Sequence, residues 1–390
     1  MSFPTQMLQD LGTIYTGSTP KTNDESLFGG DIPFVTPGDL GEITPIHTAT
    51  RSLTEEGAKT GTLLPAGAVL VCCIGSLGKI GFAGRPLVTN QQINAIVFDG
   101  KKIDPRYGFF ACRLLKPQLE SMAPATTVPI VNKSRFSELK IPVPPLEEQR
   151  RIAAILDQAE TLRTQRRTAL ALLDSLTQSL FLDMFGDPVA NPKGWSMSPL
   201  ADASDEIQIG PFGSLLHQED YVPDGIPLIN PMHIKDGKIV PGLDQGITQQ
   251  KFDELPIYQL KAGDLVMGRR GEMGRCAIVT AEHGPLMCGT GSLYIRPNAT
   301  TATATYLFHV LTSASMKAKL EEFSLGATMP NLNRGIVAGL RVSLPPLPLQ
   351  QTFATRIASI EALKATHRRA LAALDALFAS LQQRAFTGAL

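Results

Sequence analysis

Two loops of the sequence combine paired glycines with cationic side chains, a composition suited to holding a phosphate group. Residues 75–79 read Gly-Ser-Leu-Gly-Lys, and residues 268–275 read Gly-Arg-Arg-Gly-Glu-Met-Gly-Arg. The backbone N–H groups of such a loop admit a phosphate closely, and the terminal Lys79 or Arg275 would add charge. Neither loop has the Lys-Ser/Thr ending of a P-loop, so a tight hairpin turn explains each loop equally well.

The second loop also has the composition to recognise DNA bases. An arginine can pair bidentately with guanine, a carboxylate can accept from cytosine, and Asn or Gln can pair with adenine. Within seven positions the loop carries four charged residues: Arg269, Arg270, Glu272 and Arg275. Three consecutive amides offer adenine recognition in the first half of the chain: Asn90, Gln91 and Gln92. A solvated loop and a polar strand entry are the alternative interpretations of these two groups.

The sequence contains no recognisable catalytic motif. It lacks the Asp/Asn-Pro-Pro-aromatic motif of amino-methyltransferases, a glycine-rich S-adenosylmethionine loop and a Ser-His-Asp arrangement. The five cysteines form no Cys-x-x-Cys pair and have no histidine at ligand spacing, which indicates reduced thiols and no zinc. We therefore expect a non-enzymatic chain that holds no cofactor or metal of its own.

Composition restricts the class of protein further. The 390 residues include 36 Lys plus Arg and 36 Asp plus Glu, giving zero net charge, and 43% are hydrophobic. These values exclude wholesale disorder and argue against binding of nucleic acid through bulk positive charge. The longest apolar stretch, residues 68–74, is far shorter than the ~18–20 residues of a membrane span, and no signal peptide is visible. We expect a soluble, cytoplasmic protein.

A long internal repeat organises the elements that would position these loops. Residues 128–185 align without gaps to residues 329–386, at a constant shift of 201 positions, with 20 identities in 58 positions. The repeat extends more weakly towards the start of each half, where the Ile-Pro-Phe-Val of residues 32–35 resembles the Ile-Pro-Leu-Ile of residues 226–229. Such self-similarity indicates a duplication.

The first part of each half has the pattern of a mixed α/β block. Short apolar runs bounded by Gly, Pro and Asn predict strands at residues 68–71, 95–98, 264–267 and 292–295. One helix per block is expected, around residues 105–122 and 305–323. The predicted fold class is α+β, with α/β blocks at 1–145 and 187–344 and long helices at 146–186 and 345–390.

Each long helix follows a Pro-Pro pair, and residues 146–185 contain neither Pro nor Gly. Apolar or small residues recur there in steps of three and four, which predicts a heptad seam. In the first copy the seam comprises Ile152, Ile155, Ala159, Leu162, Ala169, Leu173, Leu176 and Leu180. In the second copy it comprises Phe353, Ile360, Leu363, Ala370, Leu374, Leu377 and Leu381. A 40-residue helix is ~60 Å long, too long for a compact core, so two such helices most simply pair with each other. Apolar residues beside the seam, such as Leu156 and Ile357, could pack on the chain's own blocks or on a partner.

Several segments carry a resemblance to a known family. They are residues 11–20, 29–40 (GGDIPFVTPGDL), 142–149 (PVPPLEEQ) with 152–157, and 384–388 (RAFTG). Together they resemble the DNA-specificity subunit of Type I restriction–modification systems, over essentially the whole chain. In the second half, the Pro-Leu-Gln-Gln of residues 348–351 departs from the Leu-Glu-Glu-Gln of the first half.

The resemblance implies a division of labour within a larger complex. Each α/β block would be a target-recognition domain that reads one half of a bipartite target in double-stranded DNA. The two long helices would form an antiparallel coiled coil with a pseudo-two-fold axis, which sets the distance between the halves. Two methyltransferase subunits would carry S-adenosylmethionine, and motor-nuclease subunits would bring ATP and Mg. This chain would contribute recognition and geometry only.

We predict that polar side chains in the loops of both blocks contact DNA. In the first block the candidates are Ser18, Thr19, Lys21, Thr36, Asp39, Ser76, Lys79, Asn90, Gln91, Gln92 and Lys133. In the second block they are Ser214, Asn230, His233, Arg269, Arg270, Glu272, Arg275, Thr290 and Arg334.

Three other functions fit parts of the sequence. The glycine loops could belong to a nucleotide-binding enzyme, and the long helices could belong to a coiled-coil scaffold without DNA contact. The chain could also be the recognition subunit of a related Type II-like restriction–modification assembly.

Overall fold

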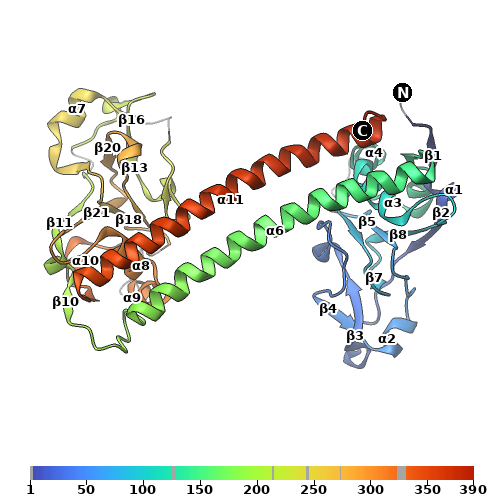
Figure 1. Cartoon of the computed structure of the whole chain (residues 1–390), viewed down its shortest axis with the longest axis horizontal. Coiled ribbons are helices and arrows are strands. Elements are labelled where there is room, and N and C mark those ends of the chain that lie inside the picture. The colour runs from blue at the N-terminus through green and yellow to red at the C-terminus, as the bar shows by residue number, and fades with distance from the viewer. Residues whose placement is uncertain (1–2, 124–127, 213–214, 243–245, 273, 323–330) are drawn as a thin grey trace. The chain divides into compact units, whose positions relative to one another are not determined.

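The computed structural model describes residues 3–123, 128–212, 215–242, 246–272, 274–322 and 331–390 (Figure 1). Contacts between residues divide the chain into two units. Unit 1 comprises residues 1–168 and 368–390, and unit 2 comprises residues 169–367. Each unit therefore contains one α/β block together with part of each of two long helices, α6 (Leu146–Phe185) and α11 (Leu347–Thr387).

Two sheets and a ribbon form the α/β block of unit 1. Its strands are β1 (Thr5–Met7), β2 (Gly12–Thr16), β3 (Phe28–Val35), β4 (Arg51–Leu53), β5 (Val69–Cys72), β6 (Ile80–Phe82), β7 (Val88–Thr89), β8 (Ile93–Phe98) and β9 (Lys140–Pro142). Four strands form an antiparallel sheet of order β2-β8-β5-β6. In a second sheet of order β4-β3-β7, strands β3 and β7 are parallel. The ribbon pairs β1 with β9, just before α6.

Unit 2 repeats this arrangement. Its strands are β10 (Met197–Pro199), β11 (Ser204–Ile209), β12 (Tyr221–Val222), β13 (Ile226–Ile229), β14 (Ile234–Lys235), β15 (Lys238–Ile239), β16 (Gly246–Ile247), β17 (Gln259–Leu260), β18 (Leu265–Gly268), β19 (Cys276–Ile278), β20 (Leu286–Cys288), β21 (Ser292–Pro297) and β22 (Arg341–Ser343). The antiparallel sheet β11-β21-β18-β19 is equivalent to β2-β8-β5-β6. Strand β13 pairs in parallel with β20 as β3 does with β7, and β10 pairs with β22 as β1 does with β9.

Short helices accompany the sheets. They are α1 (Leu8–Leu11), α2 (Glu55–Lys59), α3 (Pro105–Cys112), α4 (Lys116–Met122) and α5 (Lys133–Ser137) in unit 1, and α7 (Gln249–Glu254), α8 (Ala304–Thr312), α9 (Ala314–Glu322) and α10 (Arg334–Ala338) in unit 2. Helix α3 contacts β5, β6 and β8, and α8 contacts the equivalent strands β19 and β21.

The four predicted strands are confirmed as β5, β8, β18 and β21. The single helix expected in each block is wrong, because each region contains two helices. In unit 1 a 3-10 turn separates α3 from α4, which has Pro117 in its first turn. In unit 2 Ser313 takes an extended conformation, and its hydroxyl accepts a hydrogen bond from the N–H of Met316, which starts a new helix.

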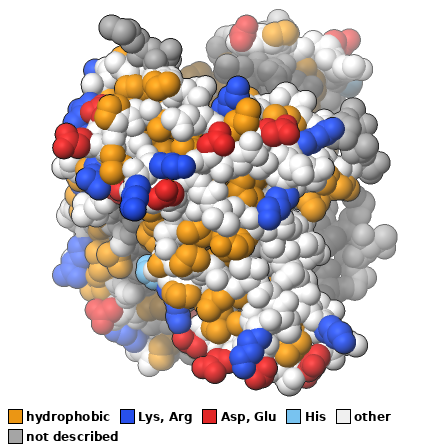
Figure 2. Space-filling model, turned by 90° about the vertical axis from the view of Figure 1, so that its right-hand side faces the viewer, with side chains coloured by type: hydrophobic (Ala, Val, Ile, Leu, Met, Phe, Trp, Pro, Cys, Tyr) orange, Lys and Arg blue, Asp and Glu red, His pale blue; other side chains and the backbone are white. Residues whose placement is uncertain are grey.

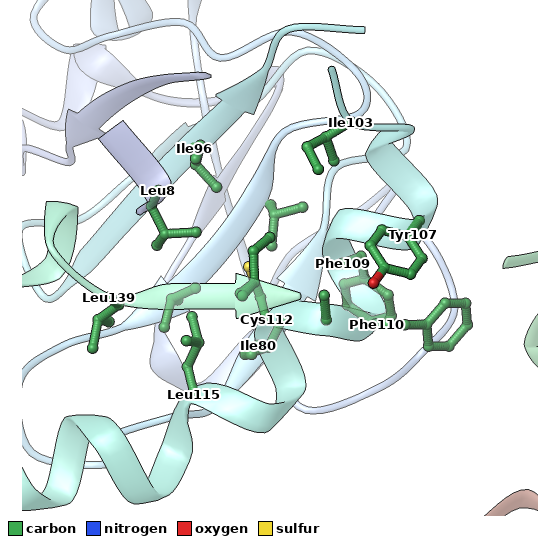
Figure 3. Packing of buried hydrophobic residues seen from close by; sticks show 14 of the residues in the cluster. Leu8, Ile80, Ile96, Ile103, Tyr107, Phe109, Phe110, Cys112, Leu115 and Leu139 are labelled. Atoms are coloured by element: carbon green, nitrogen blue, oxygen red, sulfur yellow. The ribbon is translucent and has the colours of Figure 1, made fainter. Parts of the chain in front are cut away.

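Apolar side chains from the sheets and from both long helices form the core of each unit. Tyr107 and Phe110 of α3 belong to one buried cluster with residues of the unit 1 sheet such as Ile96 (Figure 3). Ile152 of α6 and Phe386 of α11 belong to the same buried cluster. In the unit 2 cluster the long helices contribute four aromatic or aliphatic side chains: Phe181, Phe185, Phe353 and Ile357. Leu156 and Ile357 thus pack on the chain's own blocks.

The long helices have clear boundaries and are antiparallel, as predicted. Helix α6 follows a Pro-Pro pair and ends before Gly186, whose φ of +76° is the left-handed conformation that terminates helices. Arg163 of α6 pairs with Asp375 of α11 in unit 1, and Asp174 pairs with Lys364 in unit 2. Residue numbers therefore rise along α6 as they fall along α11 (Figure 1).

The predicted seam is only partly buried. Ile152, Ala159 and Phe353 are buried, and eight positions are half-buried: Ile155, Ala169, Leu173, Leu180, Ile360, Ala370, Leu374 and Leu381. The structure corrects the prediction at four leucines, which are 40–48% exposed: Leu162, Leu176, Leu363 and Leu377. Near these leucines, charged side chains of the long helices are buried instead, among them Glu160 and Lys364.

One buried glutamine fastens the start of α6 to the block of unit 1. The Gln149 side chain is 1% exposed. Its Nε2 donates to the carbonyls of Lys102 at 3.0 Å and Pro144 at 2.9 Å, and its Oε1 accepts from the N–H of Asp104 at 2.9 Å. Asp104 is the N-cap of α3, so the amide connects the first turn of α6 to the helix that packs on the sheet.

Gln350 does the same for α11 in unit 2. It is fully buried, and its Nε2 donates to the carbonyls of Thr301 at 3.0 Å and Pro345 at 2.8 Å. Its Oε1 accepts from the N–H of Thr303, the N-cap of α8, at 2.9 Å. The two glutamines lie 201 positions apart and make equivalent bonds, so the duplication preserves this junction in detail.

Replacing Gln350 by leucine should destabilise unit 2. The substitution keeps a side chain of similar size but leaves one N–H and two carbonyls without their partner. Each unsatisfied buried group costs ~1–3 kcal/mol, so we expect the free energy of unfolding to fall by about 3 kcal/mol in urea denaturation of the full chain. Gln351→Leu, at the exposed neighbouring position, is the control and should change it by less than ~0.5 kcal/mol. Equal effects of the two substitutions would contradict this role.

His309 of α8 should make stability depend on pH. Its ring packs against Phe181 and Phe353, with centroids 5.8 and 5.1 Å away. Burial, reinforced by the nearby charge of Lys364, lowers the pKa of His309 from 6.5 to about 4. Between these values the unfolded chain binds a proton that the folded chain does not, so stability falls as the pH drops from 6.5 towards 4.

We expect His309→Phe to reduce the loss of unfolding free energy between pH 7 and pH 5 by about 2 kcal/mol, because the proton is then no longer taken up on unfolding. Urea denaturation of the original chain and the variant at both pH values measures the difference. The same pH dependence in both proteins would show that His309 is not the titrating group.

Candidate nucleic-acid interface

Polar segments that are distant in the sequence meet in the block of unit 1. The segment after β2 lies against the turn between β7 and β8, since the N–H of Ser18 donates to the carbonyl of Thr89 at 2.9 Å. The Thr19 hydroxyl donates to the Gln91 side-chain carbonyl. Both residues are candidates from the sequence, and the structure brings them into contact.

Two further segments join this group. The N–H of Asn90 donates to the carbonyl of Val35, at the end of β3, at 3.1 Å. Lys79, on the glycine loop between β5 and β6, donates from Nζ to the carbonyl of Pro37 at 3.4 Å. Pro37 opens the 3-10 turn η2 (Pro37–Asp39). We call residues 17–19, 36–39, 75–79 and 89–92 the unit 1 loop cluster.

The glycine loop of this cluster is a hairpin turn whose N–H groups are used internally. Gly75 and Gly78 have φ values of +77° and +74°. The N–H of Gly75 donates to the carbonyl of Pro129, and the N–H of Gly78 donates to that of Cys72. These groups are therefore not free to cradle a phosphate, which favours the tight-turn interpretation over a nucleotide-binding loop. Ser76 and Lys79 remain as its polar side chains.

Asp39 holds the cluster together rather than presenting a free carboxylate. One oxygen accepts from the N–H and hydroxyl of Thr36 at 2.9 and 2.8 Å, and the other from the N–H and hydroxyl of Thr50 at 2.9 and 2.7 Å. Burial acts to raise the pKa of Asp39, but these four hydrogen bonds outweigh it and lower the pKa. Both carboxylate oxygens of Asp39 are thus occupied in fixing the loop, and the Thr36 hydroxyl donates to one of them.

Asn90 likewise has a structural role. It is 8% exposed, donates from Nδ2 to the Gln92 side chain at 2.9 Å and accepts from the N–H of Gln92 at 3.2 Å. Gln91 is exposed between them. Of the three amides proposed for adenine recognition, Gln91 is therefore the one whose side chain faces solvent. Lys21 and Lys133 are also exposed, Lys133 as the first residue of α5.

The loop between β18 and β19 in unit 2 repeats the cation contact of Lys79. Arg275 donates from Nη1 to the carbonyl of Pro231 at 3.1 Å, and Pro231 opens the 3-10 turn η6 (Pro231–His233) as Pro37 opens η2. Arg275 also donates to Glu272 at 2.7 Å, and this hydrogen bond lowers the pKa of Glu272. Arg270 is exposed at the tip of the loop.

The structure replaces the predicted base contact of Arg269 by a structural role. Arg269 is 4% exposed and donates from Nε to the carbonyl of Leu332 at 2.9 Å and from Nη1 to that of Thr290 at 3.5 Å. Its backbone N–H bonds to Gly291, and its carbonyl accepts from the N–H of Leu332. Arg269 therefore ties three segments together beneath the exposed Arg270.

The remaining candidates of unit 2 are mostly near this loop. Asn230 accepts from the N–H of Gly291 at 3.1 Å, and His233 Nδ1 lies 3.2 Å from the N–H of Asn230. Thr290 is half-buried, and Arg334 is exposed as the first residue of α10. Ser214 lies outside the described residues.

Sequence reasoning missed a lysine behind each glycine loop. A groove of about 610 Å³ beside Arg275 is lined by Lys235, Lys317 and Glu272, among other residues. A Cβ on Gly274 would lie 2.6 Å from Lys317, and a Cβ on Gly78 would lie 2.8 Å from Lys116. Lys116 and Lys317 are 201 positions apart, so the repeat was the signal that could have found them.

The surface charge is mixed. On the face turned to the viewer in Figure 2, Lys and Arg are interspersed with Asp and Glu, and hydrophobic side chains gather between them. Among the described residues, no group of three or more His, Cys, Asp or Glu is placed to hold a metal ion. Within the same residues, no helix has both the length and the apolar character needed to cross a membrane. The candidate interface thus consists of cations and amides on loops fixed by internal hydrogen bonds.

Comparison with known proteins gives a consistent result. The family model of the Type I restriction modification DNA specificity domain matches residues 4–171 and again residues 212–375. The MjaIX Type I restriction enzyme specificity subunit of Methanocaldococcus jannaschii is 25% identical over 374 residues, covering 89% of this chain and 84% of that protein. The HindI specificity subunit of Haemophilus influenzae is 28% identical over 184 residues, covering 44% of this chain and 39% of that protein.

Solved structures share the fold over the full length. The crystal structure of a Type I restriction–modification S subunit from M. genitalium has a TM-score of 0.65 at 15% identity, with 99% of this chain and 96% of that chain covered. A chain from a study of complex assembly and conformational transition of the type I R-M system has a TM-score of 0.59 at 19% identity, with 100% and 98% covered. The two matched family domains, one per half, establish the family predicted from the sequence motifs, and the solved structures share its fold. The chain belongs to the Type I restriction–modification DNA specificity subunit family.

Proposed function

We propose that the chain reads a bipartite target in double-stranded DNA, with one half read by each unit. The observation that carries this proposal is the duplicated loop arrangement. Lys79 binds the carbonyl of Pro37 in unit 1 as Arg275 binds that of Pro231 in unit 2, on equivalent antiparallel sheets. Two equivalent interfaces joined by antiparallel helices suit the inverted symmetry of duplex DNA.

Within each interface the side chains divide into two tasks. Exposed polar groups on the loop tips, such as Gln91 and Arg270, are suited to hydrogen bonds with base edges in the major groove. Four cations, Lys79, Arg275, Lys116 and Lys317, are suited to contacts with backbone phosphates. Such contacts position the protein on the duplex but carry no sequence information. Zero net charge predicts modest non-specific affinity of the isolated chain, because few counterions are released.

The proposal assigns catalysis to other subunits. This chain would position two methyltransferase subunits, which carry S-adenosylmethionine, and motor-nuclease subunits, which carry ATP and Mg, and would hold no cofactor itself. Membership of the specificity-subunit family and the fold shared with a chain from a complex-assembly study support these partners. The internally bonded glycine loops give no support to the nucleotide-binding alternative.

Methylation sequencing tests the whole proposal. The chain is co-expressed with the methyltransferase subunit of its own system in a host without adenine methylation. We expect one bipartite motif to become methylated, and no methylation when either subunit is expressed alone. A motif that persists without this chain would contradict the proposal. Tight binding of ATP or S-adenosylmethionine by the isolated chain in calorimetry would favour the enzyme alternative instead.

Adjacent arginines give a matched test of the interface. We expect Arg270→Ala to slow methylation of the native motif by a factor equivalent to ~1–3 kcal/mol, because an exposed bidentate contact is lost, and to leave folding unchanged. Arg269→Ala should instead lower the free energy of unfolding by about 2 kcal/mol, because buried carbonyls lose their donor. Methylation rate and urea denaturation are measured for both. An unchanged motif and rate in Arg270→Ala would remove Arg270 from the interface.

A further inference from the structure

Charged residues also connect the middle parts of the long helices, where four leucines of the predicted seam are exposed. In unit 1, Arg163 of α6 donates from Nε to Asp375 of α11 at 2.6 Å and from Nη1 to Glu160 on its own helix. The guanidinium also lies over the Phe378 ring, 4.6 Å from its centroid. Glu160 is only 5% exposed, and two arginines of its own helix, Arg163 and Arg167, compensate its carboxylate.

Unit 2 contains the same arrangement. Lys364 of α11 lies 2.8 Å from Asp174 of α6 and 2.8 Å from Glu361 on its own helix, and it donates to the Thr177 hydroxyl at 3.3 Å. Lys364 is 4% exposed. Burial acts to lower the pKa of Lys364, but the hydrogen bonds to Asp174 and Glu361 outweigh it and raise the pKa, so the ammonium stays charged.

The two arrangements belong to one register. The shift of 201 positions relates Arg163 to Lys364 and Asp174 to Asp375. Eleven positions separate Arg163 from Asp174 along α6 (174 minus 163), and eleven separate Lys364 from Asp375 along α11 (375 minus 364). Both ion pairs can therefore form only in the same antiparallel alignment of the helices.

Apolar heptads alone distinguish this alignment poorly from one shifted by seven residues, because the pattern repeats every seven. The charges do distinguish the two. A shift of seven residues in one direction would place Arg163 opposite Arg368 and Asp174 opposite Ile357, and the opposite shift would also remove both acidic partners. A shifted register would leave Arg163 and the buried Lys364 with only the acid on their own helix, Glu160 or Glu361. A polar residue at the contact of two helices is a known means of selecting register.

We infer that the Arg163–Asp375 and Asp174–Lys364 ion pairs select the register of α6 and α11. The competing explanation is that the apolar anchors at the helix ends, such as Phe353 and Phe386, fix the register without help. If the chain reads a bipartite target, the register of the helices also sets the number of base pairs between the two halves of that target. That second part rests on the proposed function.

Spin labels on the two helices report the register directly. Ser179 of α6 and Ser359 of α11 are exposed and lie in unit 2, and the five native cysteines are buried. Labels on Ser179→Cys and Ser359→Cys, in the full chain bound to its methyltransferase subunit, should give one distance. The apolar residues that anchor the helix ends, such as Phe353 and Phe386, are unchanged in this labelled protein.

The test variant replaces the four members of the two ion pairs between the helices by leucine: Arg163→Leu, Asp375→Leu, Asp174→Leu and Lys364→Leu. Apolar replacement of such paired charges is often tolerated for stability, and Glu160 keeps its ion pair with Arg167 at 3.2 Å, so the chain should fold. We expect a second, longer label distance, because a shift of seven residues displaces one label by ~10 Å along the helix axis. If this variant does not fold, Asp174→Leu with Lys364→Met should give the second distance at lower population.

The matched control replaces the four exposed leucines by alanine: Leu162, Leu176, Leu363 and Leu377. It should keep the single distance, because the ion pairs are intact. A second distance in this control, or a single unshifted distance in the leucine variant, overturns the inference.

Methylation sequencing of the same leucine variant examines the link to DNA. We expect methylated motifs with more than one spacer length, where the native chain gives one. If the second label distance appears but the spacer stays single, the claim about the spacer is overturned, and the fault lies with the proposed function rather than with the helix pair.

Discussion

The fold of each unit depends on one buried side-chain amide at the start of a long helix. Gln149 and Gln350 each satisfy two carbonyls and one N–H that are shielded from water. Because these bonds reach the N-cap of the helix that packs on the sheet, the direction of the long helix is tied to the block. A hydrophobic residue could fill the same space, but it could not make these three hydrogen bonds to the backbone.

The candidate interface follows the same principle on a smaller scale. Asp39, Asn90 and Arg269 are polar residues that the sequence offers for DNA contact. In the structure Asp39 and Arg269 bond separate segments to one another, and Asn90 bonds Gln92 within its own turn. Their bonds fix the loops from within and leave side chains such as Gln91 and Arg270 outside. A preformed surface of this kind loses little conformational entropy when a rigid partner binds.

The sequence was sufficient to predict the large features of the fold, but not which individual side chains are buried. The repeat, the strands and the long helices follow from periodicity and from Pro and Gly positions, which are local properties. Arg269 and Arg270 are indistinguishable at that level, because the burial of Arg269 depends on the carbonyl of Leu332, 63 positions away. The prediction that the four seam leucines are buried was wrong for a related reason. Two adjacent faces of a long helix show similar spacing, and only the opposing helix decides which one is covered.

The duplication copies the frame but not the side chains that it presents. Unit 1 displays Gln91 and Lys79 on its loops, whereas unit 2 displays Arg270 and Arg275. Under the proposed function, a nearly symmetric protein of this kind would read two unlike sequences, so its target would not be a palindrome. Such a target has a sense of direction along the duplex, and the protein could bind it in one orientation only. The complex built on this chain would then distinguish upstream from downstream, although its scaffold arose from two copies of one unit.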